Sequence, residues 1–163
     1  MIKKIKGNIF NTSCQVLVNT VNCIGVMGKG IALECKLRFP GMFEKYKEFC
    51  EKKLIKPGFL QLWNSSKPWI LNFPTKIHWK DPSKIEYLEK GLDKFKNEYS
   101  KKNITSIAFP LLGASLGGLS EELVYKTMIK YLEPLKNIDI EIYEYDPNAG
   151  DDLFDLFHQK VWR

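Results

Sequence analysis

Residues 16–33 read VLVNTVNCIGVMGKGIAL and form the stretch around which the rest of the chain is organised. The stretch begins with apolar, β-favouring residues and ends with helix-compatible ones, so its glycines fall where a strand gives way to a helix. Glycine permits a positive φ and a close approach of the backbone, and the following helix offers unpaired N–H groups with a partial positive charge. The pattern therefore predicts a loop that holds a phosphate through backbone groups.

Two asparagines, Asn19 and Asn22, flank this turn. Each amide offers one acceptor and two donors without charge, a combination that suits the hydroxyls of a ribose. Asparagine and glycine also favour ordinary turns, so a capped connection without a ligand is the alternative interpretation. Glycine spacing alone leaves the two interpretations about even, and the asparagines favour the ligand.

The composition is typical of one soluble globular domain, with 163 residues, 44% hydrophobic and 27% charged. No run of about 18 apolar residues is present, and the N-terminus lacks the apolar block of a signal peptide, so we expect a cytoplasmic protein without a membrane partner. Four irregularly spaced cysteines and two histidines predict reduced thiols and no metal site. The net charge of +6 fits a polyanionic partner and simple solubility equally well.

Strands alternate with helices along the chain. Periodicity predicts strands near residues 2–7, 16–19, 59–63, 69–73, 104–109 and 138–145, and helices over 31–39, 43–50, 85–99, after Ser120 and over 153–162. The strands 59–63 and 69–73 read as a hairpin. This order predicts an α/β fold with a mixed, largely parallel sheet, helices on both faces, and a ligand at the carboxyl ends of the strands.

A second glycine-rich turn covers residues 110–119, PLLGASLGGL, directly after the predicted strand 104–109. Both glycine loops follow strands and precede helices, so we expect them to converge on one ligand. A diphosphate held between two backbone loops explains why no G-x-x-x-x-G-K-S/T lysine and no acidic metal cluster is present. No cofactor is predicted.

These motifs resemble those of the macrodomain family, whose fold is a three-layer α/β/α sandwich that binds ADP-ribose. The resemblance rests on GNI at 7–9, VNTVN at 18–22, the loop 25–30 and the turn 110–119, in family order, and implies a single macrodomain over 1–163. NFPTKIHW at 72–79 makes the DNA ADP-ribosyl glycohydrolase antitoxins of the DarG type the more similar branch. The terminal ADP-ribose protein glycohydrolase branch is similar over the same stretches, but less so.

The resemblance implies a role for each matching residue. It places Asn8, Ile9 and Tyr143 near the adenine and Asn22 on the distal ribose, with Asn19 supporting the same loop. The diphosphate is expected between two loops, formed by Gly28, Lys29 and Gly30 and by Ser115, Leu116, Gly117 and Gly118. Ordinary turn chemistry or core packing is the alternative for each of these residues.

Two positions depart from patterns common among macrodomains. Asn8 stands where many members have an aspartate that accepts a hydrogen bond from the adenine amino group, and an amide carbonyl also accepts. Gly117 stands where the protein-directed glycohydrolases carry a catalytic aspartate. The missing acid favours the DNA-directed activity.

Lys76 is the residue that the resemblance marks as catalytic. A lysine amine becomes a nucleophile at neutral pH when a partly desolvated pocket or neighbouring cations lower its pKa. We expect Lys76 to act on the anomeric carbon of the proximal ribose, by attack and a transient Schiff base or by stabilising the developing charge. Trp79 is a candidate for stacking on an unpaired base, with Lys80 on a phosphate. His78 is a candidate proton shuttle, and core packing is the alternative for both rings.

The expected function is therefore removal of ADP-ribose from thymidine in single-stranded DNA, with a cognate ADP-ribosyltransferase as a possible partner. Hydrolysis of ADP-ribosyl esters of protein Asp or Glu, or of O-acetyl-ADP-ribose, is the alternative within the enzyme class. A non-catalytic reader of ADP-ribose is the alternative outside it. The sequence assigns no role to the segment 146–163.

Overall fold

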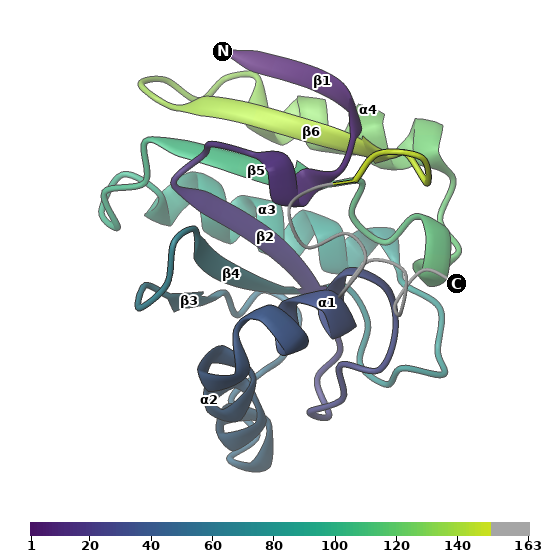
Figure 1. The fold of residues 1–163 in the computed structure, drawn as a ribbon. Coiled ribbons are helices and arrows are strands. Elements are labelled where there is room, and N and C mark those ends of the chain that lie inside the picture. Colours follow the sequence, from purple (N-terminus) through teal and green to yellow (C-terminus); the bar gives the residue numbers. More distant parts are fainter. Residues whose placement is uncertain (151–163) are drawn as a thin grey trace.

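A six-stranded sheet forms the centre of the protein, whose structure is a computed structural model that describes residues 1–150. In chain order the strands are β1 (Ile2–Gly7), β2 (Val16–Val21), β3 (Gln61–Trp63), β4 (Trp69–Pro74), β5 (Ser106–Pro110) and β6 (Asp139–Tyr145). Their order in the sheet is β1-β6-β5-β2-β4-β3, which can be followed from top to bottom in Figure 1. All neighbours are parallel except the β3–β4 hairpin, so the predicted mixed, largely parallel sheet is confirmed.

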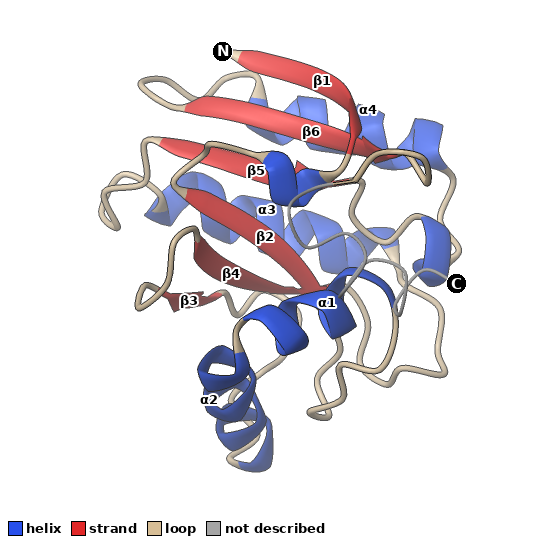
Figure 2. Cartoon of the chain, viewed as in Figure 1, coloured by secondary structure: helices blue, strands red, loops and turns tan. Residues whose placement is uncertain are grey.

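Helices cover both faces of this sheet. They are α1 (Gly30–Arg38), α2 (Pro40–Glu51), α3 (Ile85–Glu98) and α4 (Glu121–Leu132), with two short 3-10 helices, η1 (Ile9–Asn11) and η2 (Ser115–Gly117). α1 and α2 lie on one face and α3 and α4 on the other, which makes the predicted three-layer α/β/α sandwich (Figure 2). The helix expected over 153–162 falls outside the described residues.

The central strand β2 is buried on both sides, as its unbroken apolar run predicts. Val16 and Val18 pack into the core shared with α3 and α4, whereas Leu17 and Val21 pack into the core shared with α1 and α2. Alternate side chains of a strand point to opposite faces, so this one strand supplies both cores.

The helix boundaries follow from local signals in the sequence. α1 ends at Arg38, two residues before Pro40, and Pro40 then occupies the first turn of α2, where a missing N–H costs nothing. The Ser120 hydroxyl accepts a hydrogen bond from the Leu123 N–H and caps α4. Among residues 1–150, no helix is both long and apolar enough to cross a membrane.

Candidate functional site

A cavity of about 740 Å³ opens at the edge of the sheet where the parallel strands end. The segments that follow β1, β2, β4 and β5 line it, together with the end of β6 and the start of α1. Ligands of α/β sheets bind at this edge, because the loops that follow parallel strands meet there. The cavity lies where the two glycine-rich loops were expected to converge.

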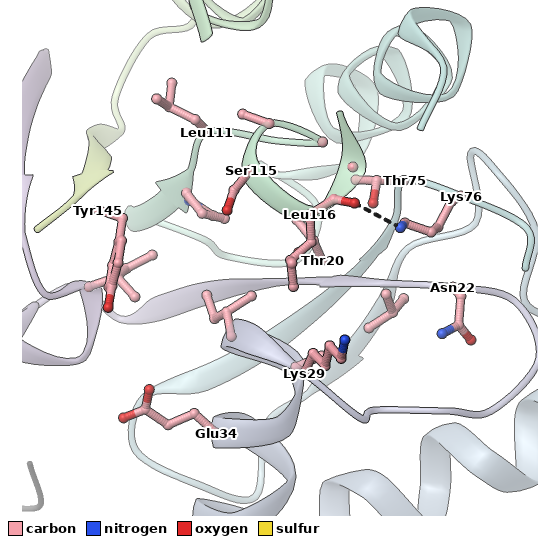
Figure 3. A pocket seen from close by; sticks show the side chains of 18 of the residues that line it. Thr20, Asn22, Lys29, Glu34, Thr75, Lys76, Leu111, Ser115, Leu116 and Tyr145 are labelled. Carbon is pink, nitrogen blue, oxygen red and sulfur yellow. Dashed lines mark hydrogen bonds between the residues drawn. The ribbon is translucent and has the colours of Figure 1, made fainter. Parts of the chain in front are cut away.

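The cavity is elongated, and different side chains occupy its two ends (Figure 3). Tyr145 and Glu34 lie toward one end, and Asn22 and Lys76 toward the other. Between them, Lys29 and Ser115 approach the cavity from its two glycine loops. An elongated ligand with a central anionic group fits this distribution.

The first glycine loop presents unpaired backbone donors at the start of α1. The N-cap residue Lys29 makes no capping hydrogen bond with its side chain, and the first N–H bonded within this turn is that of Leu33, 3.3 Å from the Lys29 carbonyl. Gly30 has a φ of 59°, which a residue with a side chain rarely adopts. Lys29, Ile31 and Ala32 line the cavity. Among residues 1–150, the N–H groups of Ile31 and Ala32 have no backbone acceptor, so these donors and the helix dipole favour an anion there.

The second glycine loop is shaped by η2. The N–H of Gly117 donates to the Ala114 carbonyl at 2.9 Å and that of Gly118 to the Ser115 carbonyl at 3.3 Å. Within the described part of the chain, the N–H groups of Ser115 and Leu116 have no such acceptor. Ser115, Leu116 and Gly117 line the cavity, so this loop also offers donors to an anion.

Asn22 uses most of its amide to shape the first loop. Its Oδ1 accepts from the N–H groups of Ile24 and Val26 and from the Tyr46 hydroxyl, and its Nδ2 donates to the Val26 carbonyl at 2.7 Å. One Nδ2 hydrogen is left for a ligand in the cavity that Asn22 lines. Asn22 therefore organises the loop in addition to any contact with a ribose.

Asn8 and Ile9 line the cavity directly after β1. The Asn8 Oδ1 accepts a hydrogen bond from the Phe10 N–H at 2.9 Å and so caps η1. Its Nδ2 is buried and has no partner among residues 1–150. A buried donor without a partner is unfavourable, so a ligand that places a hydrogen-bond acceptor here would bind more tightly.

Tyr143 and Tyr145 both belong to β6 and line the same end of the cavity as Asn8. The Tyr143 hydroxyl donates to the Glu141 carboxylate at 3.0 Å, and burial raises the Tyr143 pKa to about 12. Tyr145 is 40% exposed, and burial with the nearby charges of Glu34 and Asp146 raises its pKa. Both phenols stay neutral at physiological pH and supply apolar ring faces.

Asn19 does not line the cavity; it is fully buried under the loop. Its Nδ2 donates to Asn72 Oδ1 at 3.0 Å and lies 3.8 Å from the sulfur of Met27, which belongs to the first glycine loop. Asn72 in turn donates to Gln61 Oε1 at 3.1 Å. A chain of buried amides thus joins β2, β4 and β3 and supports the loop from below.

Lys76 follows β4 and reaches toward the second glycine loop (Figure 3). Its Nζ donates to the Leu116 carbonyl at 3.2 Å and to the Trp79 carbonyl at 3.4 Å. Burial lowers the Lys76 pKa, and the charge of Asp81 partly opposes this change. The amine therefore lies at one end of the cavity in a state that loses its proton more readily than an ordinary lysine.

The turn after Lys76 presents aromatic and basic groups at the mouth of the cavity. Trp79 is 50% exposed, and the Lys80 amine lies 5.2 Å from its ring centroid. His78 does not line the cavity: its Nδ1 accepts from the Lys80 N–H at 3.1 Å and its ring packs against Trp79. His78 therefore shapes this turn, and its role as a proton shuttle stays a prediction.

Cys23 lies beside Lys76 without being activated. Its sulfur is 3.5 Å from the Lys76 carbonyl, and burial raises its pKa to about 11. The thiol is neutral at physiological pH and a poor nucleophile. Among residues 1–150, no group of three or more His, Cys, Asp or Glu side chains is arranged to hold a metal ion.

The structure brings most of the predicted site residues to one cavity. Those that line it are Asn8, Ile9, Asn22, Gly28, Lys29, Lys76, Trp79, Lys80, Ser115, Leu116, Gly117 and Tyr143. Four others do not line it: Asn19, Gly30, Gly118 and His78. Their contacts with a ligand stay predictions in every case.

The lining residues that were not among the predicted site residues include Phe10, Thr20, Glu34, Thr75 and Tyr145. Thr20, Thr75 and Tyr145 stand at or just beyond the ends of parallel strands, a position that could have marked them. Glu34 gave no such signal, because it occupies a helix position where a charged residue is ordinarily exposed. In the structure it is buried and pairs with Arg38 at 2.8 Å.

Comparison with known proteins assigns the fold to a family. The model of the Macro domain family matches residues 18–128. The chain is 37% identical over 148 residues to a DNA ADP-ribosyl glycohydrolase of Thermus aquaticus, with 88% of this chain and 41% of that protein covered. It is 39% identical over 154 residues to a protein of the same name from Mycobacterium tuberculosis, covering 92% and 43%. The chain thus spans about two fifths of the length of these curated relatives.

Two solved structures show the same arrangement. The macrodomain of Thermus aquaticus DarG superposes with a TM-score of 0.84 at 38% identity, covering 88% of this chain and 98% of that one. Thermosipho africanus DarTG in complex with ADP-ribose also gives a TM-score of 0.84, at 33% identity and covering 99% and 46%. The sheet, the cavity at its edge and the family match together show that this chain belongs to the macrodomain family.

Proposed function

We propose that this protein binds ADP-ribose and removes it from thymidine in single-stranded DNA. The observation that carries the proposal is the amine of Lys76, held at one end of an ADP-ribose-sized cavity with its pKa lowered by burial. A protein that only bound ADP-ribose would have no need of such a group. Relatives named DNA ADP-ribosyl glycohydrolases support the choice of reaction.

The cavity orients ADP-ribose in one direction. The adenine lies between the aromatic rings near Tyr145 and the unpartnered Nδ2 of Asn8. The diphosphate lies between the start of α1 and the Ser115 and Leu116 N–H groups, where both loops offer donors. The ribose that carries the modified base, at the far end of ADP-ribose from the adenine, then falls at the end that holds Asn22 and Lys76.

In this orientation the neutral amine of Lys76 attacks the anomeric carbon of the ribose that carries the modified base. The new C–N bond forms as the bond to the base breaks, and the base takes a proton as it leaves. The first proton that the attacking nitrogen loses goes to the departing base. The ring C–O bond then breaks as the anomeric carbon forms the C=N bond of a Schiff base, and the second nitrogen proton passes to the ring oxygen. Water then adds to this carbon, which frees the lysine and releases ADP-ribose.

The DNA strand lies across the turn that follows Lys76. Trp79 is half exposed beside the cavity mouth and offers a ring face to a neighbouring base. Lys80 lies over that ring and supplies a positive charge to the adjoining phosphate. Val26 and Leu116, both exposed and both lining the cavity, extend the apolar rim on the two glycine loops.

Hydrolysis of ADP-ribosyl esters of protein Asp or Glu is the second candidate. The charge of Asp81 acts on Lys76, so a carboxylate lies near the amine even though position 117 is a glycine. Asp81 is exposed and is not among the residues that line the cavity, which makes it a poorer candidate for the catalytic carboxylate. The free ester O-acetyl-ADP-ribose belongs to the same chemistry.

A cognate transferase follows from this proposal. An enzyme that removes ADP-ribose needs one that attaches it, and a relative from Thermosipho africanus is named as a fusion of a DNA ADP-ribosyl transferase with a glycohydrolase. We expect the partner of this chain to be a transferase that modifies thymidine. The transferase and this protein would act on the same thymidine of the same DNA substrate, one attaching ADP-ribose and the other removing it.

The test compares release of ADP-ribose from a thymidine-linked oligonucleotide and from a glutamate-linked protein. We expect turnover of the oligonucleotide by the wild type, and loss of at least about 100-fold of the rate in Lys76→Ala with ADP-ribose binding retained. Lys84→Ala is the matched control, because Lys84 precedes α3 outside the cavity and its amine lies over the Tyr87 ring. If only the glutamate-linked protein is turned over, the substrate is a modified protein and not DNA. If ADP-ribose binds and neither substrate is turned over, this chain is a reader of ADP-ribose.

A further inference from the structure

Two connections join the segment that carries Lys76 to the second glycine loop. The first is the hydrogen bond from Lys76 Nζ to the Leu116 carbonyl, at 3.2 Å. The second lies seven residues further along the chain, where the N–H of Ser83 donates to the Gly117 carbonyl at 2.9 Å. Hydrogen bonds to two adjacent residues of η2, Leu116 and Gly117, therefore join the second glycine loop to the segment that carries the amine.

The side chain of Ser83 fills a notch that two glycines leave open. A Cβ added to Gly113 would lie 3.0 Å from Ser83 Cβ, and a Cβ added to Gly117 would also lie 3.0 Å from it. The Cβ at Gly117 would approach Ser83 Oγ even more closely, inside van der Waals contact. Ser83 is 4% exposed, so it cannot swing into solvent to make room.

The presence of a hydroxyl at Ser83 is not explained by a hydrogen bond within the described residues. Its Oγ is buried and has no partner among residues 1–150. A buried hydroxyl without a partner lowers stability, so an alanine would serve the fold better at this position. What the hydroxyl does is occupy volume against Gly117, beside the carbonyl that Ser83 already holds.

We propose that Ser83 is a positioning residue, whose side chain acts as a wedge between Gly113 and Gly117 and sets the distance between Lys76 and the second glycine loop. The proposal rests on the function proposed above and deepens it, because it says how the amine is placed relative to the diphosphate. It also explains why position 117 is a glycine: Ser83 occupies the space that any side chain there would need. A one-ångström displacement of a reacting group can cost on the order of 100-fold in rate.

The test is a pair of substitutions that exchange volume between the two positions. Gly117→Ala adds a methyl that meets Ser83, so the loop moves away and the Lys76–Leu116 contact is lost. We expect kcat to fall by about 10- to 100-fold, with a smaller change in ADP-ribose affinity. Adding Ser83→Gly removes both clashing atoms, and the double variant recovers kcat to within about threefold of Ser83→Gly alone.

Gly28→Ala is the matched control. Gly28 also lines the cavity, but a Cβ there would meet only the Val26 side chain, at 3.6 Å. The double variant Gly28→Ala/Ser83→Gly should be no more active than Gly28→Ala alone. Thermal melts of all the variants establish that each one is folded.

A second readout keeps this test separate from the test of the proposed function. Acylation of Lys76 by acetic anhydride as a function of pH, followed by mass spectrometry of its peptide, measures the pKa of its amine without any substrate. Opening the loop hydrates the amine, so its pKa should rise toward the ordinary value in Gly117→Ala and fall back in the double variant. An unchanged pKa and kcat in Gly117→Ala, or a failure of Ser83→Gly to restore them, would overturn the wedge. A wild type without turnover would overturn the function alone.

Discussion

The amine of Lys76 has two properties that a nucleophile at neutral pH needs. It reaches one end of the cavity, and burial lowers its pKa. Two carbonyls, of Leu116 and Trp79, hold it there, and Asp81 supplies the one charge that opposes the shift. The reactivity of this residue is therefore decided by neighbours that are up to forty positions away in the chain.

The rate of the proposed reaction should depend on pH. Only the neutral amine attacks carbon, so kcat/KM should rise with pH and level off with a midpoint below the ordinary lysine pKa of about 10.4. Asp81→Asn removes the charge that raises the Lys76 pKa, so its midpoint should move to lower pH. Measuring kcat/KM across the pH range for wild type and Asp81→Asn checks both statements.

Lys84→Ala again provides the control, with an expected midpoint equal to that of the wild type. A rate that falls with rising pH would contradict attack by the neutral amine. A midpoint that stays unchanged in Asp81→Asn would show that the carboxylate does not act on Lys76.

At the scale of elements, the strands are held in place beneath the site by buried amides. The chain from Asn19 to Asn72 to Gln61 crosses β2, β4 and β3, all at positions that point toward α1 and α2. Met27 and Met42 pack their sulfur atoms against these amides. Polar groups here are tolerated because nearly every one finds a partner.

Asn19→Ala should therefore destabilise the fold. It leaves Asn72 Oδ1 buried without its donor, and we expect a loss of about 1–3 kcal/mol in the free energy of unfolding. Urea unfolding followed by tryptophan fluorescence measures it. Asn64→Ala is the control, because Asn64 is exposed in the turn of the hairpin, and its effect should stay within about 0.5 kcal/mol. Equal stabilities of the two variants would contradict a structural role for Asn19.

At the scale of the whole molecule, α3 packs closely against one face of the sheet. α3 lies so close to the sheet that a Cβ at Gly91 would come within 2.6 Å of Phe73 Cε1, with another ring carbon closer still. Phe73 belongs to β4, the strand that leads into Thr75 and Lys76. The contact between one glycine and one ring therefore sets how closely α3 packs against the strand that leads into Lys76.

Gly91→Ala is expected to overpack this contact and to lower the free energy of unfolding by about 1–3 kcal/mol or more, despite the better helix propensity of alanine. Phe73→Leu in the same chain should restore part of the loss, because the smaller side chain gives room. Chemical denaturation of both variants gives the values. Lys90→Ala, at the exposed neighbouring position of α3, should change the free energy of unfolding little. A similar loss in Lys90→Ala would show that the effect comes from the helix itself and not from the contact with Phe73.

Local patterns in the sequence determined much of this protein. The unbroken apolar run of β2 predicted a strand buried on both sides, and the repeat of apolar residues from Ile85 to Tyr99 predicted α3 almost to its ends. The glycines of the two loops and the serine that caps α4 could be predicted for the same reason. Each depends on the conformation or periodicity of a few adjacent residues.

Which of these residues face the cavity depends on contacts between segments that are distant in the chain. Asn19 and Asn22 look equivalent in sequence, yet the alternation of β2 buries the first under the loop while the second lies beyond the strand at the cavity. Glu34 and Ser83 gave no local signal, because their burial depends on segments distant in the chain. Conformation is set by neighbours in sequence, whereas burial, pKa and close contact are set by neighbours in space.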